Sequence, residues 1–197
     1  MPTIAYPIGK SLYLNITNQC SNDCTFCIKF NSRTFHENDL FLITEPSFDE
    51  IMAAIDAFRN FDEVVFCGYG ESLLRLEMVK QVAAAVKQKY SIRVRINTDG
   101  QANLVHGRNI IPELVGIVDS LSVSLNAADA ETYMRLCHSP FGAAGFAAVC
   151  DFIRLAAAAI PEVIASIVLL PSINVEACKA LALSLGASFR VRSYCDG

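Results

Sequence analysis

Three cysteines near the start of the chain are close enough in sequence to share one metal centre. Cys20, Cys24 and Cys27 form the pattern C-x3-C-x2-C in a segment of mostly polar residues. Thiolates are the usual ligands of iron–sulfur centres. Three ligands leave one metal with an open coordination position, the feature that separates catalytic from structural metal sites. The spacing therefore predicts an iron–sulfur cluster that can bind a further molecule.

Two other interpretations of the cysteines were weighed against this one. Zinc also binds thiolates, and a Cys3His zinc site could take His36 as its fourth ligand. Zinc knuckles usually lie in small modules, however, whereas these cysteines follow the first strand of a large α/β pattern. Free cysteines buried in a core are common, but three of them in a polar loop do not resemble core packing. We therefore favour the iron–sulfur interpretation.

The segments around the cysteines alternate between strand and helix patterns. The runs that we expect to be strands are Leu12–Ile16, Glu63–Cys67, Ile92–Asn97, Ser120–Leu125, Val163–Leu170 and Ser188–Ser193. Such alternation predicts a parallel sheet with right-handed crossovers. A full eight-fold barrel usually needs about 250 residues, so we expect an α/β fold with an open partial (β/α)6 barrel, and a flat doubly wound sheet is the alternative.

Helical periodicity fills the intervals between these strands. Apolar residues recur at helical spacing in Ile51–Phe58, Val79–Val86 and Phe146–Ile153. Ser47 and Glu50 precede the first of these runs as a capping box. A further helix is expected after Asn174, ending near Gly186. With 197 residues and 53% hydrophobic residues, the chain is expected to form one domain over residues 1–197.

Several of the predicted strands alternate between apolar and polar residues. Leu121, Val123 and Leu125 are interleaved with Ser122 and Ser124, and two other strands follow the same pattern. A parallel sheet covered on both faces would have almost continuously apolar strands. The alternation instead predicts a barrel whose interior is polar and holds a ligand. An antiparallel sheet with one wet face is the alternative, which the intervening helices disfavour.

The composition narrows the classes of partner. There are 16 Lys and Arg residues against 20 Asp and Glu residues, a net charge of −4, which disfavours nucleic-acid binding. The amino-terminal sequence lacks the pattern of a signal peptide. The most apolar stretch, from Leu155 to Leu170, is interrupted by Pro161 and Glu162 and is too polar for a membrane span. We therefore expect a cytoplasmic protein with no membrane contact, whose cysteines serve metal binding or catalysis.

Two motifs together resemble the radical S-adenosylmethionine (SAM) superfamily. The first is C-x3-C-x-aromatic-C after the first strand, in which Phe26 fills the aromatic position. The second is the segment Gly68-Tyr69-Gly70-Glu71 after the second strand, which resembles the family's Gly-Gly-Glu motif. The backbone of that motif receives the methionine amino group of SAM. Tyr69 stands where the family often has a glycine, and a serine follows in place of the common proline.

Polar positions on later strands extend the resemblance. Asn97 opens a segment similar to the family's N-T-N-G turn, and Ser124 and Asn126 lie in a segment similar to the V-S-L-D strand of the molybdenum-cofactor branch. In that branch the serine contacts the bound cofactor. Ser166 falls where the branch has a polar residue on its fifth strand. The resemblance therefore implies that these four residues bind the cofactor, together with Phe26 and the second motif.

The resemblance nearest to the whole chain is to the small radical SAM proteins associated with the TatD family. The five cysteines outside the loop show no C-x2-C spacing, which disfavours a second cluster. Cys137, Cys150 and Cys178 fall in helical patterns and are expected to be packing residues. Cys67 and Cys195 should lie near the carboxyl ends of the strands, where active sites collect. Either could touch substrate, although filling space is the simpler interpretation.

The resemblance implies a specific chemistry. A [4Fe-4S] cluster on Cys20, Cys24 and Cys27 would cleave SAM reductively to a 5′-deoxyadenosyl radical, which abstracts hydrogen from a substrate. The electron would come from an external donor similar to a flavodoxin or ferredoxin. The substrate is expected to be a small molecule or a protein that enters an open barrel mouth. The alternative is an iron–sulfur electron-transfer or binding protein without radical chemistry.

Overall fold

A curved seven-stranded sheet organises the chain. The computed structural model describes residues 2–31 and 34–194. The strand order is β1-β2-β5-β6-β7-β8-β9, in which β1 pairs antiparallel with β2 and every later pair is parallel. The strands are β1 (Ala5–Ile8), β2 (Ser11–Leu14), β5 (Glu63–Phe66), β6 (Arg93–Thr98), β7 (Ser120–Ser124), β8 (Glu162–Val168) and β9 (Ser188–Arg192). A separate hairpin joins β3 (Thr34–Phe35) to β4 (Asn38–Asp39).

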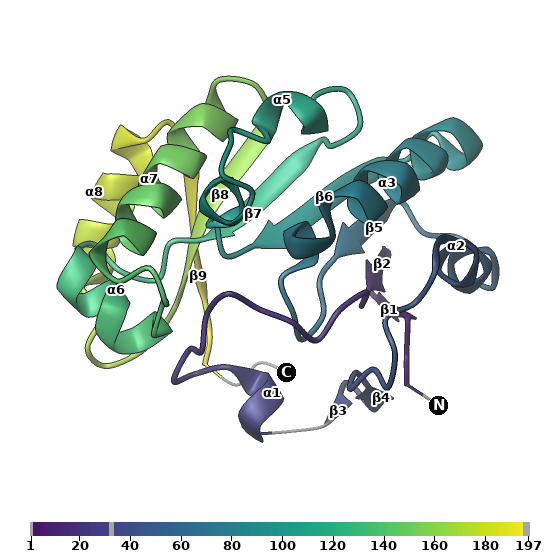
Figure 1. Ribbon diagram of the computed structural model, residues 1–197, viewed down its shortest axis with the longest axis horizontal. Helices are drawn as coiled ribbons and strands as arrows, with labels where there is room; N and C mark the ends of the chain where they lie inside the picture. Colours follow the sequence, from purple (N-terminus) through teal and green to yellow (C-terminus); the bar gives the residue numbers. More distant parts are fainter. Residues whose placement is uncertain (1, 32–33, 195–197) are drawn as a thin grey trace.

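Helices connect the strands of the sheet. They are α1 (Ile28–Asn31), α2 (Phe48–Asp56), the 3-10 helix η1 (Ser72–Arg75), α3 (Leu76–Tyr90), α4 (Ala102–Val105), α5 (Ile111–Leu114), α6 (Ala130–Cys137), α7 (Ala143–Ala157) and α8 (Val175–Ser184). In Figure 1 the larger helices lie along the outer side of an open arc of strands, and α1 and the β3–β4 hairpin lie on the other side. No helix in the described ranges is both long enough and apolar enough to cross a membrane.

The alternating strands separate an apolar face from a polar face. Leu121 and Val123 of β7 are fully buried in the core that the strands share with the helices. The apolar face of α3, with Val79 and Val82, packs into the same core. Ser124 points to the inner side, where it lines a cavity. The period of two along each strand thus places the polar side chains away from the helices.

The α/β fold and the parallel strands confirm the architecture expected from the sequence. All six expected strands are present, and the arc does not close into a barrel. The capping box of Ser47 and Glu50 is present on α2, and Asn174 caps α8 through a 3.0 Å bond from the Ala177 amide. The sequence reasoning missed β1, which carries Pro7 and lies at the sheet edge, where proline is tolerated. It also missed the two-residue strands β3 and β4.

Candidate active site

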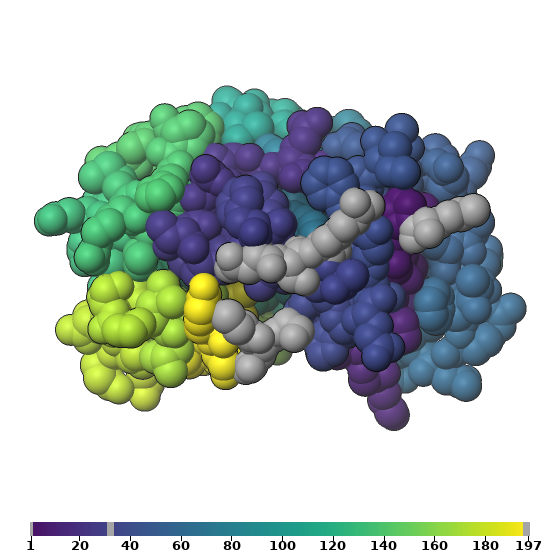
Figure 2. All heavy atoms as spheres, turned by 90° about the horizontal axis from the view of Figure 1, so that it is seen from below, coloured from purple at the N-terminus to yellow at the C-terminus, as the bar shows by residue number. Residues whose placement is uncertain are grey.

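A cavity of about 600 Å³ opens on the inner side of the sheet, at the carboxyl ends of the strands. Its lining comes from both ends of the chain, including Cys20 in the loop after β2 and Arg192 at the end of β9. Figure 2 shows the indigo segment that carries the cysteine loop and α1 next to the yellow end of β9 on one face of the molecule. Ligands of open α/β sheets bind at this end of the strands.

Most of the residues singled out from the sequence meet in this cavity. The positions that line it are Cys20, Cys24, Phe26, Cys27, Gly68, Gly70, Glu71, Asn97, Ser124 and Asn126. Two do not. Tyr69 is buried and packs with Tyr6 and Leu40, and Ser166 is buried with its hydroxyl 3.4 Å from the Val123 carbonyl. Cys67 also lines the cavity, whereas Cys195 lies outside the described residues.

The carboxyl end of α6 holds the cysteine loop. The amide of Asp23 donates to the Cys137 carbonyl over 3.0 Å, and the amide of Thr25 donates to the Leu136 carbonyl over 2.9 Å. Asn22, which is buried, donates to the Tyr133 hydroxyl over 3.1 Å. These bonds fix the loop between Cys20 and Cys27 by its backbone, so the cysteine side chains remain directed at the cavity.

The surroundings of the three thiols favour their protonated form. Burial raises the pKa of Cys20, and the Asp99 carboxyl, 3.9 Å from its sulfur, raises it further. A hydrogen bond with the Cys137 thiol raises the pKa of Cys24, and burial adds to it. Burial also raises the pKa of Cys27. A metal that binds these sulfurs must therefore displace their protons.

The three thiols suit a soft metal centre. Within the described ranges, no three His, Cys, Asp or Glu side chains already stand in a ligating arrangement. Cys20, Cys24 and Cys27 are nevertheless free thiols that line one cavity, and an all-thiol set is the donor chemistry of an iron–sulfur centre. His36, the candidate zinc ligand, lines the same cavity with its ring edge-on to Phe35, 4.5 Å between centroids.

Glu71 ties the ends of two strands to the cysteine loop. Its carboxyl oxygens accept from the Leu73 amide at 2.9 Å and the Asp99 amide at 2.6 Å. Its own amide donates to the Gln19 carbonyl over 2.7 Å. Burial raises the pKa of Glu71 to about 8, and the neighbouring Asp99 contributes to the rise. The Glu71 side chain is therefore held by two backbone amides, and the Glu71 amide in turn holds the loop at Gln19.

Gly68 and Gly70 allow the end of β5 to pack against the residues before Cys20. A Cβ on Gly70 would lie 2.4 Å from the Gln19 carbonyl oxygen, and a Cβ on Gly68 would lie 2.1 Å from Asn15 Oδ1. Both distances are shorter than any real contact. The sequence argument assigned these glycines to close approach of a ligand. The structure shows in addition that the chain itself occupies the space that a side chain would need.

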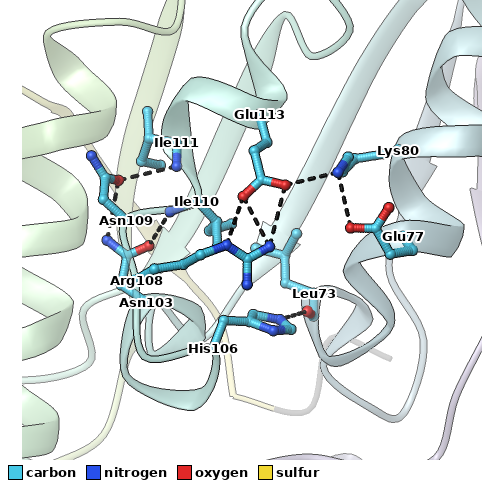
Figure 3. A network of polar contacts seen from close by, with 10 residues as sticks. All are labelled: Leu73, Glu77, Lys80, Asn103, His106, Arg108, Asn109, Ile110, Ile111 and Glu113. Carbon is cyan, nitrogen blue, oxygen red and sulfur yellow. Dashed lines mark hydrogen bonds and ion pairs between the residues drawn. The ribbon is translucent and has the colours of Figure 1, made fainter.

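The turn after Glu71 is supported from its outer side. The carbonyl of Leu73 in η1 lies 2.8 Å from His106 Nε2, which must donate because a carbonyl only accepts (Figure 3). Glu113 nearby bridges Lys80 at 2.7 Å and Arg108 at 3.0 Å, which ties α3 to the α4–α5 region. The Leu73 amide in turn donates to the Glu71 carboxyl, which lines the cavity, so this network supports the cavity wall from outside.

Two asparagines that line the cavity each carry a buried side-chain oxygen with an unused acceptor. Asn97 Oδ1 and Asn126 Oδ1 have no hydrogen-bond partner among the described residues. Both residues line the cavity, and Asn126 is 4% exposed with its backbone in the left-handed region, φ 56°. A buried unpaired acceptor costs free energy comparable to a lost hydrogen bond. A ligand that carries N–H or O–H donors would satisfy both oxygens.

Sequence reasoning missed two parts of the cavity. The first is an aromatic wall, defined here as Tyr6, Tyr13 and Phe35, in which the Tyr6 and Tyr13 rings stack 5.5 Å apart and the Phe35 ring lies edge-on to Tyr6 at 6.2 Å. The second is Arg192. The alternation of β9 marked Arg192 as inward-facing, but nothing in the sequence linked it to residues 6–35.

Comparison with known proteins agrees with this geometry. A family model described as the radical SAM superfamily matches residues 14–185. A radical SAM methyltransferase from Sphaerobacter thermophilus shares the fold with a TM-score of 0.62 and 15% identity, over 96% of this chain and 68% of the other. Archaeal TYW1 shares it with a TM-score of 0.60 and 9% identity, over 95% of this chain and 66% of the other. The chain thus spans about two thirds of each neighbour. No curated protein matches the chain.

Proposed function

The chain belongs to the radical SAM superfamily, and we propose that it is an enzyme that holds a [4Fe-4S] cluster on Cys20, Cys24 and Cys27. When bound, the cluster supplies an electron that cleaves SAM to methionine and a 5′-deoxyadenosyl radical, which takes a hydrogen atom from the substrate. The convergence of three thiols, two glycines and two unpaired asparagine oxygens on one cavity carries the proposal.

The residues of the chain divide this work between them. The cysteines bind the metal, and α6 holds the loop that presents them. Asn97 and Asn126 accept hydrogen bonds from donors on SAM, and Ser124 faces the same space. The backbone from Gly68 to Glu71 borders the cavity beside the thiols, where it can receive the methionine amino group. An external one-electron donor, flavodoxin-like or ferredoxin-like, completes the system.

The test is an anaerobic assay for 5′-deoxyadenosine. Purified protein is reconstituted with iron and sulfide, reduced, mixed with SAM and analysed by mass spectrometry. We expect about four iron atoms per chain and 5′-deoxyadenosine from the wild type. Cys24→Ala should lose both. The matched control is Cys150→Ala, because Cys150 is a partly buried thiol on α7 that does not line the cavity.

The alternative functions predict other outcomes. An iron–sulfur carrier would bind the cluster, give no 5′-deoxyadenosine and show no change in the spectrum of the reduced cluster when SAM is added. A zinc site would contain zinc in place of iron and would lose it in His36→Ala. Either result would overturn the proposal.

A further inference from the structure

Arg192 brings to the cavity a positive charge that the proposed chemistry leaves unused. It ends β9, the strand at one edge of the sheet. Its Nη2 donates to the Ser124 hydroxyl over 3.3 Å, which turns the guanidinium toward the cavity. None of the ion pairs between described residues includes Arg192. The charge therefore lacks a carboxylate partner in the part of the chain that the structure describes.

Two other arginines on the inner side of the sheet have such partners. Arg95 pairs with Glu63 at 3.0 Å, and Arg93 pairs with Glu162 at 2.8 Å. Arg192 instead has a second arginine, Arg190, two residues away on the same face of β9. Although much of the Arg192 side chain is open to solvent, the protein around its guanidinium lowers its pKa, and Arg190 also contributes. An anion bound in the cavity would favour the charged guanidinium and so offset both its burial and its repulsion from Arg190.

The aromatic wall lines the same cavity and comes from β1, β2 and the β3–β4 hairpin. The hydroxyls of its tyrosines are already engaged. Tyr6 donates to the Cys67 carbonyl over 3.2 Å, and Tyr13 accepts from Arg95 over 3.3 Å. Tyr6 is 2% exposed and backs the wall, whereas the half-buried rings of Tyr13 and Phe35 present its apolar surface to the cavity. The cavity is thus lined by both aromatic rings and a cation that has no carboxylate partner among the described residues.

We propose that the substrate is an organic anion whose carboxylate or phosphate pairs with Arg192 and whose apolar part lies against the aromatic wall. The assignment rests on the proposed function, because it takes this cavity as the place of reaction. Guanidinium groups pair with both kinds of anion through two parallel hydrogen bonds. A cavity of about 600 Å³, lined by aromatic and aliphatic side chains together with polar ones, has the size of a small-molecule site.

The experiment measures the affinity of four probes by calorimetry: acetate, benzoate, inorganic phosphate and phenyl phosphate. They are titrated into the reconstituted protein with saturating SAM, and again into the protein without cluster or SAM. We expect benzoate or phenyl phosphate to bind more tightly than the bare anion, and the better of the two series identifies carboxylate or phosphate. Arg192→Gln should weaken binding about 10- to 100-fold, and Arg192→Lys should recover part of it.

Two further variants test separately how much Arg192 and the aromatic wall contribute to probe affinity. Arg190→Gln is the matched control, because Arg190 lies on the same strand face without lining the cavity, and it should change affinity less than about threefold. Phe35→Ala should weaken the aromatic probes and leave acetate and inorganic phosphate unchanged. Melting temperatures close to that of the wild type establish that each variant is folded.

Three outcomes would overturn the proposal: no binding of any probe by the wild type, equal probe affinity in Arg192→Gln, or loss of SAM affinity in Arg192→Gln with probe affinity retained. The last outcome would assign Arg192 to the SAM carboxylate. Because probe binding is also measured without cluster or SAM, it can fail while 5′-deoxyadenosine still forms, or succeed while none forms. The two proposals are thereby tested separately.

Discussion

Gly70→Ala should push the cysteine loop away from the end of β5. The added Cβ would lie 2.4 Å from the Gln19 carbonyl oxygen and 2.5 Å from the Thr17 carbonyl oxygen, and both must move to at least 3.0 Å. These atoms belong to the backbone, so no rotation of a side chain relieves the overlap. The movement also lengthens the 2.7 Å bond from the Glu71 amide to Gln19.

The cost follows from these two effects. Overpacking of a rigid site costs about 1–3 kcal/mol, and a weakened backbone hydrogen bond costs about 1 kcal/mol. The free energy of unfolding should therefore fall by about 2–4 kcal/mol. For a chain of this size, that lowers the melting temperature by about 5–15 °C. Circular dichroism of the metal-free protein measures the shift, and iron content after reconstitution should drop because the loop that carries Cys20 is displaced.

Gly116→Ala is the matched control. Gly116 has φ 85°, and no atom lies within 4 Å of the Cβ that alanine would add. Its cost is limited to the backbone strain of a left-handed residue, about 1–2 kcal/mol, and iron content should remain that of the wild type. The steric reasoning is refuted if Gly70→Ala melts no lower than Gly116→Ala and binds as much iron.

Three further predictions concern Glu71, the loop anchor and a helix cap. Burial raises the pKa of Glu71 from 4.5 to about 8, so the folded state binds this proton more tightly than the unfolded state does. The free energy of unfolding should therefore fall as the pH rises from about 4.5 to about 8. Urea denaturation of the metal-free protein should show this fall, and Glu71→Gln should reduce it. Tyr133→Phe leaves the buried Asn22 amide without its acceptor and should cost about 1–3 kcal/mol in urea denaturation, with reduced iron content. Ser47→Ala removes the α2 capping box and should cost about 1 kcal/mol in the same measurement, with iron content unchanged.

The parts of the fold that depend on local pattern were predictable. The alternation of apolar and serine residues in β7 indicated both its strand and its polar face, and Asn174 marked the start of α8. The spacing of Cys20, Cys24 and Cys27 places three thiols in one loop, and all three line the cavity, while their joint binding of a metal stays a prediction. In each case the signal lies within a few neighbouring residues, where period and spacing carry the information.

Features that depend on contacts between distant residues escaped the sequence. Cys137 is buried on α6, as expected of a packing residue, but its thiol also contacts Cys24, more than a hundred positions earlier. The pairing of β1 with β2 brings Tyr6 beside Tyr13, and Pro7 hid the strand. Ser166 shares its strand pattern with cavity residues and lies in register with Ser124, which lines the cavity. Ser166 is nevertheless only 1% exposed and its hydroxyl donates to the Val123 carbonyl, a packing difference between neighbouring strands that neither strand encodes alone.

β1 and β9 end the strand order and do not pair with each other, so no strand pair between described residues fixes the width of the gap between them. In a closed barrel, the number and stagger of the strands fix the bore. Here Tyr6 on one edge strand and Arg192 on the other line the same cavity, and no hydrogen-bonded ladder between described residues sets the distance across it. A change in the curvature of the sheet would therefore change the width of the cavity without breaking any strand pair.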